Sequence, residues 1–153
     1  MLKQSYRLSF TQIGFITFAF QVTASILQPF VGNYTDKKPK AFAFVGGMFF
    51  TLSGIALLAF ARDFVSILTA ACLIGIGSSV FHPEASRVAY YASGGKRGLA
   101  QAIFQLGGNG GTALGPLLIA FIVIPFGQEH IIWFIIPALL AIVVLYTDIL
   151  PVF

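Results

Sequence analysis

The chain has 153 residues, of which 58% are hydrophobic and only 9% are charged. Soluble domains carry about 25% charged residues, so this composition excludes an ordinary soluble globular protein. The net charge of +4 does not indicate a nucleic-acid partner, because the basic residues lie in short gaps between apolar runs rather than in one patch. The composition therefore predicts an integral membrane protein whose main partner is membrane lipid.

Charged residues divide the chain into five long apolar runs. Asp, Glu, Lys and Arg are absent from residues 8–35, 41–61, 64–81, 98–128 and 131–147. A membrane helix needs about 20 mainly apolar residues, which each run can supply or nearly supply. We therefore expect an all-α polytopic helix bundle that forms a single transmembrane domain over residues 1–153. Its spans should lie near residues 10–33, 41–61, 65–86, 99–124 and 130–150.

The lysine and arginine residues predict how the bundle is oriented. The gaps after the first and third spans hold six of them, namely Lys37, Lys38, Lys40, Arg87, Lys96 and Arg97. The other side holds three, namely Lys3, Arg7 and Arg62. Basic residues favour the cytoplasmic side of a membrane. We therefore expect the two richer gaps in the cytoplasm of a multi-pass protein of the inner (plasma) membrane. The N-terminus would then lie outside, which suggests a missing first helix.

The gap after the first span has a distinctive order of residues. Gly32 is followed by Asp36, Lys37 and Lys40, an order that resembles the cytoplasmic signature between helices two and three of the major facilitator superfamily. Pro39 stands where that signature usually has a glycine. Gly32 would allow a neighbouring helix to approach closely, and Asp36 could accept hydrogen bonds from helix N-terminal amides and pair with a base. The alternative is an ordinary solvated turn.

Three further stretches carry a more specific resemblance. Residues 27–32, 75–84 and 100–109 resemble the fosmidomycin resistance protein family of that superfamily. The resemblance implies a secondary transporter, an antiporter that exports a drug or small organic molecule against protons and so confers antibiotic resistance. It also implies a fragment carrying helices two to six of the N-terminal half, which would need a missing complementary half or an oligomer. The alternative is a non-transporting membrane subunit or an inert truncated product.

Polar side chains inside the fourth span are candidates for a cavity lining. Gln101, Gln105, Asn109 and Thr112 are spaced by four, four and three residues, which places them on one face of a helix. Either they line a watery cavity, or they form structural hydrogen bonds between helices. His82, near the end of the third span, is a fifth candidate. It could relay protons, because the pKa of histidine lies near physiological pH, or it could be a packing residue.

The same span contains a helix-packing motif. Gly111, Gly115 and Pro116 resemble the helix-five signature of the drug/proton antiporters of the superfamily, although the usual second glycine pair is absent. The glycines would permit tight packing, and Pro116 would remove a backbone donor and bend the helix. The alternative is a common small-residue packing motif without a specific function.

Three charged residues near the ends of spans are candidate gating charges. Glu84 and Arg87 are three residues apart on one helix and can pair locally. In the wider superfamily, an acid that ends helix four faces an arginine that opens helix five, and Arg97 resembles the latter. With Asp36 and Lys37, these residues could form a cytoplasmic latch. The alternative is an exposed ion pair that contributes about 0–1 kcal/mol.

We expect no enzymatic activity and no cofactor. The sequence shows no nucleophile with a base, no phosphate-binding loop and no pair of catalytic carboxylates. His82 and His130 are isolated, and Cys72 is the single cysteine, so no metal-ligand spacing is present.

The orientation yields a first testable prediction. Cysteines introduced at Lys38 and Lys96, on a background with Cys72 replaced by alanine, should react with an impermeant thiol reagent only after the cells are opened, because both gaps should be cytoplasmic. Labelling of both positions from outside intact cells would overturn the orientation.

Overall fold

The computed structural model describes residue 6, residues 8–37 and residues 41–149, without the side chains of 36–37, 41–42, 44 and 144–149. Every regular element in these ranges is helical, which confirms the all-α prediction. The long helices are α2 (Phe10–Lys37), α3 (Ala41–Phe60), α4 (Phe64–Tyr91), α5 (Arg97–Leu118) and α7 (Ile135–Ile149). Between α5 and α7 lie a π-helical stretch (Ile119–Val123), the short α6 (Ile124–Phe126) and a 3₁₀ segment (Gln128–Phe134).

The described helices overlap the expected spans. Phe10–Thr35, Phe64–Tyr91 and Arg97–Phe126 are each long and apolar enough to cross a membrane. Two shorter apolar helices, Val45–Phe60 and Gln128–Val143, overlap the two remaining expected spans. Many large apolar side chains on these helices face outward, as lipid contact requires. The division into five membrane crossings stays a prediction.

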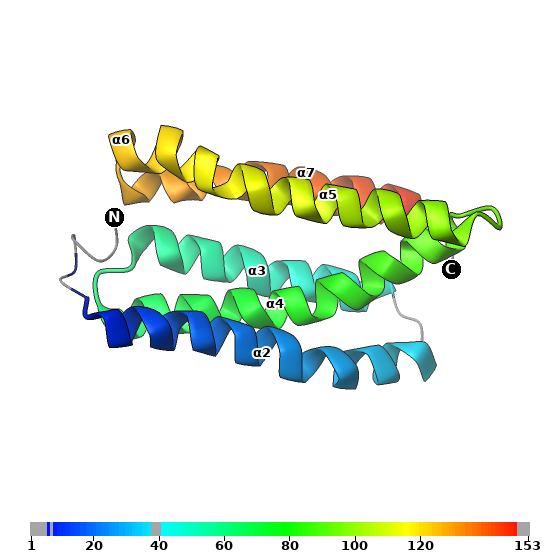
Figure 1. The fold of residues 1–153 in the computed structure, drawn as a ribbon, viewed down its shortest axis with the longest axis horizontal. Helices are drawn as coiled ribbons and strands as arrows, with labels where there is room; N and C mark the ends of the chain where they lie inside the picture. The colour runs from blue at the N-terminus through cyan, green and yellow to red at the C-terminus, as the bar shows by residue number, and fades with distance from the viewer. Residues whose placement is uncertain (1–5, 7, 38–40, 150–153) are drawn as a thin grey trace.

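The helices are arranged in two layers. Figure 1 shows α2, α3 and α4 running side by side in one layer, with α5, α6 and α7 in the other. The layers meet where α3 contacts α7 and the 3₁₀ segment, and where the turn after α4 brings α5 back along the bundle. One end of the bundle, called the basic end here, carries Arg87, Lys96 and Arg97. The other end, called the Gln128 end, carries the turns at 61–63 and 127–128.

Helix α4 is packed between α2 and α3 with little space between the backbones. A Cβ atom built on Gly77 would lie 2.6 Å from the carbonyl oxygen of Gly47 and 2.7 Å from the amide nitrogen of Thr51. A Cβ built on Gly75 would lie 2.8 Å from the carbonyl oxygen of Phe20 and collide with Thr23. These contacts are with backbone atoms, which cannot rotate away. Glycine is therefore required on two sides of α4, as in other closely packed membrane helices.

The N-terminus of α4 is capped by its own sequence. The Asp63 carboxylate accepts a hydrogen bond from the Ser66 amide at 2.7 Å, and the Ser66 hydroxyl accepts one from the Asp63 amide at 3.3 Å. This capping box satisfies two backbone donors. The backbone hydrogen bond from Ser66 lowers the pKa of Asp63 below its ordinary value of 3.8. The contribution of the cap to stability is therefore fully present at neutral pH and is lost as the pH falls through the lowered pKa.

Helix α5 changes its winding after Pro116. The proline lacks an amide hydrogen, and the π-helical stretch Ile119–Val123 begins three residues later. Local π winding is a known way of accommodating a break in the hydrogen-bond ladder. The helix continues through α6 and ends at Gly127, whose φ of 103° is strained for other residues. The bend expected at Pro116 stays a prediction, while the structure shows a change of winding just after it.

The tight packing of α4 generates a second prediction. Gly77→Ala should lower the free energy of unfolding by about 1–3 kcal/mol, because the added methyl group forces α3 and α4 apart. Gly107→Ala on α5 is the matched control, since no described atom lies within 4 Å of a Cβ built there. It should be neutral or stabilise the helix by up to about 1 kcal/mol. Unfolding in mixed micelles, followed by circular dichroism, measures both. Equal effects would contradict the packing.

Candidate functional site

An arginine on α4 caps the C-terminal end of α2. Arg87 Nη1 donates to the carbonyl oxygen of Thr35, and Nη2 donates to the Thr35 hydroxyl, each at 2.9 Å. Thr35 lies in the last turn of α2, where carbonyl groups have no partner within the helix. Its side chain also donates to the carbonyl oxygen of Val31 at 2.9 Å. The planar guanidinium thus holds the ends of two helices together in a fixed geometry.

The same guanidinium neutralises a buried carboxylate. Glu84 is 3% exposed, and its Oε1 lies 3.2 Å from Arg87 Nη1. A longer hydrogen bond of 3.4 Å joins Nη1 to Oε2. An isolated buried carboxylate is costly, whereas one beside a hydrogen-bonded arginine is tolerated. The spacing of three residues predicted this pair, and the structure shows it as a buried pair rather than an exposed one.

The cytoplasmic latch was also expected to include Arg97, Asp36 and Lys37. Arg97 makes a different contact, and the side chains of Asp36 and Lys37 are not described. The Arg97 guanidinium lies over the ring of Tyr90, 4.5 Å from its centroid, which is a cation–π contact rather than a contact with Glu84. Asp36 and Lys37 end α2, but their side chains are outside the described part, as is Lys40 altogether. No described atom lies within 4 Å of a Cβ built on Gly32, so the close approach expected there is not seen.

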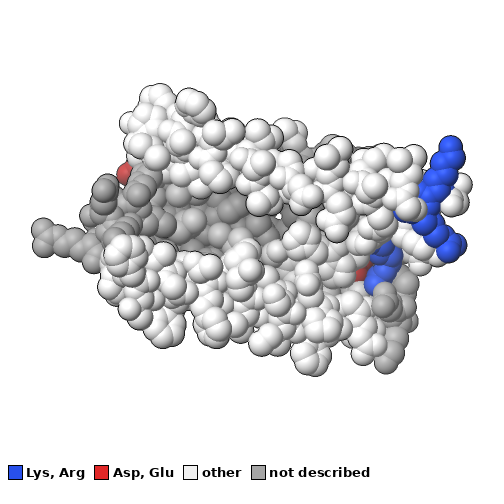
Figure 2. Space-filling model, viewed as in Figure 1, with Lys and Arg blue, Asp and Glu red and all other residues white. Residues whose placement is uncertain are grey.

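An open cavity with both polar and apolar side chains in its lining lies near this cluster, where α2, α4 and α5 meet. Its volume is about 660 Å³, and it is lined by Gln28, Pro29, His82, Pro83, Ser86, Gln101, Phe104 and Gln105. Figure 2 shows the molecule hollowed between its two layers. Pro29 and Pro83 each remove a backbone donor from the helix wall, which frees carbonyl groups nearby. The cavity therefore brings together amide, imidazole and hydroxyl groups in an otherwise apolar bundle.

Only part of the predicted polar stripe reaches this cavity. Gln101 lies in its wall, where its Nε2 donates to the carbonyl oxygen of Ser86 at 3.0 Å and its Oε1 accepts from the Ser86 hydroxyl at 3.2 Å. Gln105 also lines the cavity, whereas Asn109 and Thr112 do not. Thr112 donates to its own helix, at the Gly108 carbonyl, over 3.0 Å. Two interpretations were open for these side chains, a cavity lining or structural hydrogen bonds between helices. Gln101 does both, because it bonds to Ser86 of α4 and also lines the cavity.

The glycines of α5 differ from those of α3 and α4. No described atom lies within 4 Å of a Cβ built on Gly107, Gly111 or Gly115. The packing motif at Gly111, Gly115 and Pro116 is therefore not used for contact within the described residues. Among the described residues, tight glycine contacts lie instead on α3, at Gly47 and Gly54, and on α4, at Gly75 and Gly77.

Sequence reasoning also missed Thr35 and Ser86, the partners of Arg87 and Gln101. A threonine or serine in an apolar helix usually bonds to its own backbone, so the residue type alone gives little signal. Among the described residues, no group of three or more His, Cys, Asp or Glu side chains could hold a metal ion. His82 lies at the rim of the cavity, with its ring 5.9 Å from that of Phe81, and it is exposed.

Comparison with known proteins identifies the class. Residues 1–151 match the sequence model of the Major Facilitator Superfamily, so the chain belongs to this superfamily of membrane transporters, as the motifs indicated. The chain is 57% identical, over 145 residues, to the fosmidomycin resistance protein of Escherichia coli (strain K12). It is 49% identical, over 145 residues, to the uncharacterized MFS-type transporter YfnC of Bacillus subtilis (strain 168).

Both alignments cover 95% of this chain and 36% of the relative. The chain therefore spans about a third of the length of these relatives. No solved structure matches the chain.

The Arg87 cluster gives a third prediction. Arg87→Met should cost about 3–5 kcal/mol of stability, because it leaves the Glu84 carboxylate buried without a cation and the end of α2 uncapped. Arg97→Met is the control, since it removes only the contact with the Tyr90 ring, worth about 0.5–1 kcal/mol. Unfolding of both variants in mixed micelles gives the comparison. If Arg97→Met were as damaging as Arg87→Met, the assignment of the buried cluster would be wrong.

Proposed function

We propose that this chain forms part of a proton-coupled antiporter of the inner (plasma) membrane that exports a drug or small organic molecule. The observation that carries the proposal is the open cavity between α2, α4 and α5, which lies near the buried Glu84–Arg87 pair. Polar groups within membrane helices are costly, and they usually serve a substrate or ion path. The E. coli relative, at 57% identity, is named for resistance to fosmidomycin, which makes a phosphonate-type drug the first substrate to test.

The two candidate proton carriers differ in position. His82 is exposed and lines the cavity, and an imidazole side chain can both accept and donate a proton. Glu84 is buried beside Arg87, so protonation of its carboxylate would weaken the ion pair. We favour Glu84 as part of the latch and His82 as the relay.

The remaining chain of the longer relatives, or an oligomer, would complete the substrate path. The glycine-bearing face of α5 and the side chains of Gln105 and Asn109 are exposed in this chain. Lipid cannot satisfy amide groups, so these residues need protein or water beside them. The alternative function is that of a non-transporting membrane subunit. The exposed glycine face of α5 supports this alternative too, because it could pack against another membrane protein.

A chimera tests the proposed function. The matched residues of the E. coli fosmidomycin resistance protein would be replaced by those of this chain, in cells that lack the native protein. We expect the chimera to restore fosmidomycin resistance and proton-driven drug export, whereas this chain alone should show no gradient-driven counterflow in proteoliposomes. A double variant, Gln101→Ala with Gln105→Ala, should lower export at least about tenfold. Leu106→Ala, at a position of α5 that does not line the cavity, should not.

One result would count against this function, and another would count against the need for a complementary half. A chimera that reaches the membrane in normal amounts without restoring resistance would contradict the proposed function. Saturable, gradient-driven uptake by this chain alone would instead refute the need for a complementary half and would imply a functional oligomer.

The latch has its own test, in the same chimera. Glu84→Gln removes one charge and keeps the shape, so it should weaken the link to Arg87 and shift the population toward the inward-open state. Turnover should fall, while drug affinity in a state-independent assay should change little, because a ligand senses the shift only through its differential affinity for the two states. Distances between spin labels on the two cytoplasmic faces follow the population. An unchanged distribution with abolished proton exchange would make Glu84 a proton carrier instead.

A further inference from the structure

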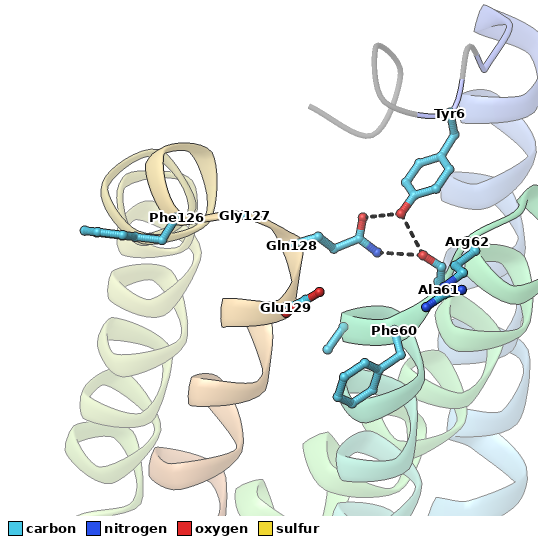
Figure 3. Close-up of a pocket in the computed structure, with 9 residues that line it drawn as sticks. Tyr6, Phe60, Ala61, Arg62, Phe126, Gly127, Gln128 and Glu129 are labelled. Carbon is cyan, nitrogen blue, oxygen red and sulfur yellow. Dashed lines mark hydrogen bonds between the residues drawn. The ribbon is translucent and has the colours of Figure 1, made fainter.

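A second polar cluster lies at the Gln128 end of the bundle. Gln128 Nε2 donates to the carbonyl oxygen of Leu58 at 2.6 Å and to that of Ala61 at 3.1 Å. The Tyr6 hydroxyl lies 2.7 Å from Gln128 Oε1 and 2.7 Å from the Ala61 carbonyl oxygen. Figure 3 shows Gln128 and Tyr6 converging on Ala61. Three segments far apart in the chain therefore meet at one amide group.

The donors and the acceptor of the Gln128 side-chain amide all have hydrogen-bond partners. The amide has two N–H donors and an oxygen acceptor, and each has a partner here. The carbonyl groups of Leu58 and Ala61 belong to the last turn of α3 and the residue after it, and that of Leu58 also accepts a long hydrogen bond of 3.4 Å from the Ala61 amide. Gln128 is thus a C-terminal cap of α3 supplied from the other layer. The turn that delivers it depends on Gly127, whose positive φ favours glycine.

Among the described residues, this contact is one of two hydrogen-bonded links that a glutamine side chain makes between the layers. At the basic end, Gln101 of α5 bonds to Ser86 of α4. At the Gln128 end, Gln128 bonds to the end of α3. Beside Gln128 lies a cavity of about 330 Å³, with Phe60 and Arg62 on one side and Phe126 and Glu129 on the other. The clasp of Tyr6, Gln128 and Ala61 forms one wall of this cavity.

We propose that Gln128 is the positioning residue of a conformational clasp, which holds the α5–α7 layer on α3 and closes the space between the layers at this end. When the clasp opens, the two layers separate at the Gln128 end while the Gln101–Ser86 link keeps them together at the basic end. Water then reaches the ends of α3 and α4 through the cavity. This device acts within the chain and does not depend on which substrate is carried.

Spin labels at both ends of this chain, in lipid nanodiscs and with Cys72 replaced by alanine, test the clasp. Val65 and Ile124 are exposed, lie in different layers near the Gln128 end and take no part in the described hydrogen bonds of Tyr6 and Gln128. Tyr34 and Ile103 serve in the same way nearer the basic end. Gln128→Ala should lengthen and broaden the Val65–Ile124 distance and leave the Tyr34–Ile103 distance unchanged. Gln21→Ala, an exposed amide on α2, should change neither.

Thiol labelling gives a second readout. A cysteine at Ala61, which is 3% exposed, should react about tenfold faster with a water-soluble reagent in the Gln128→Ala variant. Tenfold is the change that 1.4 kcal/mol makes in an equilibrium constant. Gln128→Glu should open the clasp as Gln128→Ala does, because a carboxylate keeps the shape but cannot donate to two carbonyls. Tyr6→Phe should open it less, since both carbonyl bonds of Gln128 remain.

Three results would overturn the proposal. The first is a Gln128→Glu variant with wild-type distances and labelling rates. The second is a change at both ends of the bundle, which would mean general loosening rather than a clasp. The third is a Tyr6→Phe variant that opens the Gln128 end as far as Gln128→Ala, which would assign the role to Tyr6. If Gln128→Ala does not fold, Gln128→Glu and Tyr6→Phe give the same comparison.

Discussion

The packing of α4 against α2 and α3 is the constraint on which the rest of the described structure depends. At Gly75 and Gly77 the neighbouring backbones come so near that a single methyl group has no room. In lipid there is no hydrophobic force to push helices together, so close van der Waals contact between backbones must do this work. The depth and rotation of α4 are therefore defined by the two glycines. The position of α4 in turn determines where Asp63 at its start and Glu84 and Arg87 near its end lie.

A second constraint is that the ends of membrane helices need partners for their backbone groups. The described helices find these partners in different ways. Asp63 caps the start of α4 from within its own sequence, whereas Arg87 and Gln128 cap the ends of α2 and α3 from other elements. A cap supplied from another element also fixes the position of that element. The buried carboxylate of Glu84 is tolerated because the arginine that neutralises it is already held by Thr35.

Local features of the structure could be predicted from the sequence, and long-range ones could not. Apolar runs predicted the helices, and a spacing of three residues predicted the Glu84–Arg87 pair, because both depend on the geometry of one helix. The partner of Arg87 on α2 could not be predicted, since it depends on how far α4 is shifted along α2. The position of α5 along α4 could not be predicted either, so the sequence could not show which polar residues of α5 line the cavity. Gln101 and Gln105 reach the cavity while Asn109 and Thr112 lie beyond it, although all four share one face.

The claim that the glycine contacts of α4 define the position of Arg87 can be measured directly in bilayers. Solid-state NMR can detect the dipolar coupling between a ¹⁵N-labelled Arg87 guanidinium and the ¹³C-labelled carbonyl of Thr35, whose oxygen lies 2.9 Å from Nη1. We predict a strong coupling in the wild-type chain and a clearly weaker one in Gly77→Ala. An equally strong coupling in both would show that Arg87 finds Thr35 without the glycine contacts, and would contradict the account.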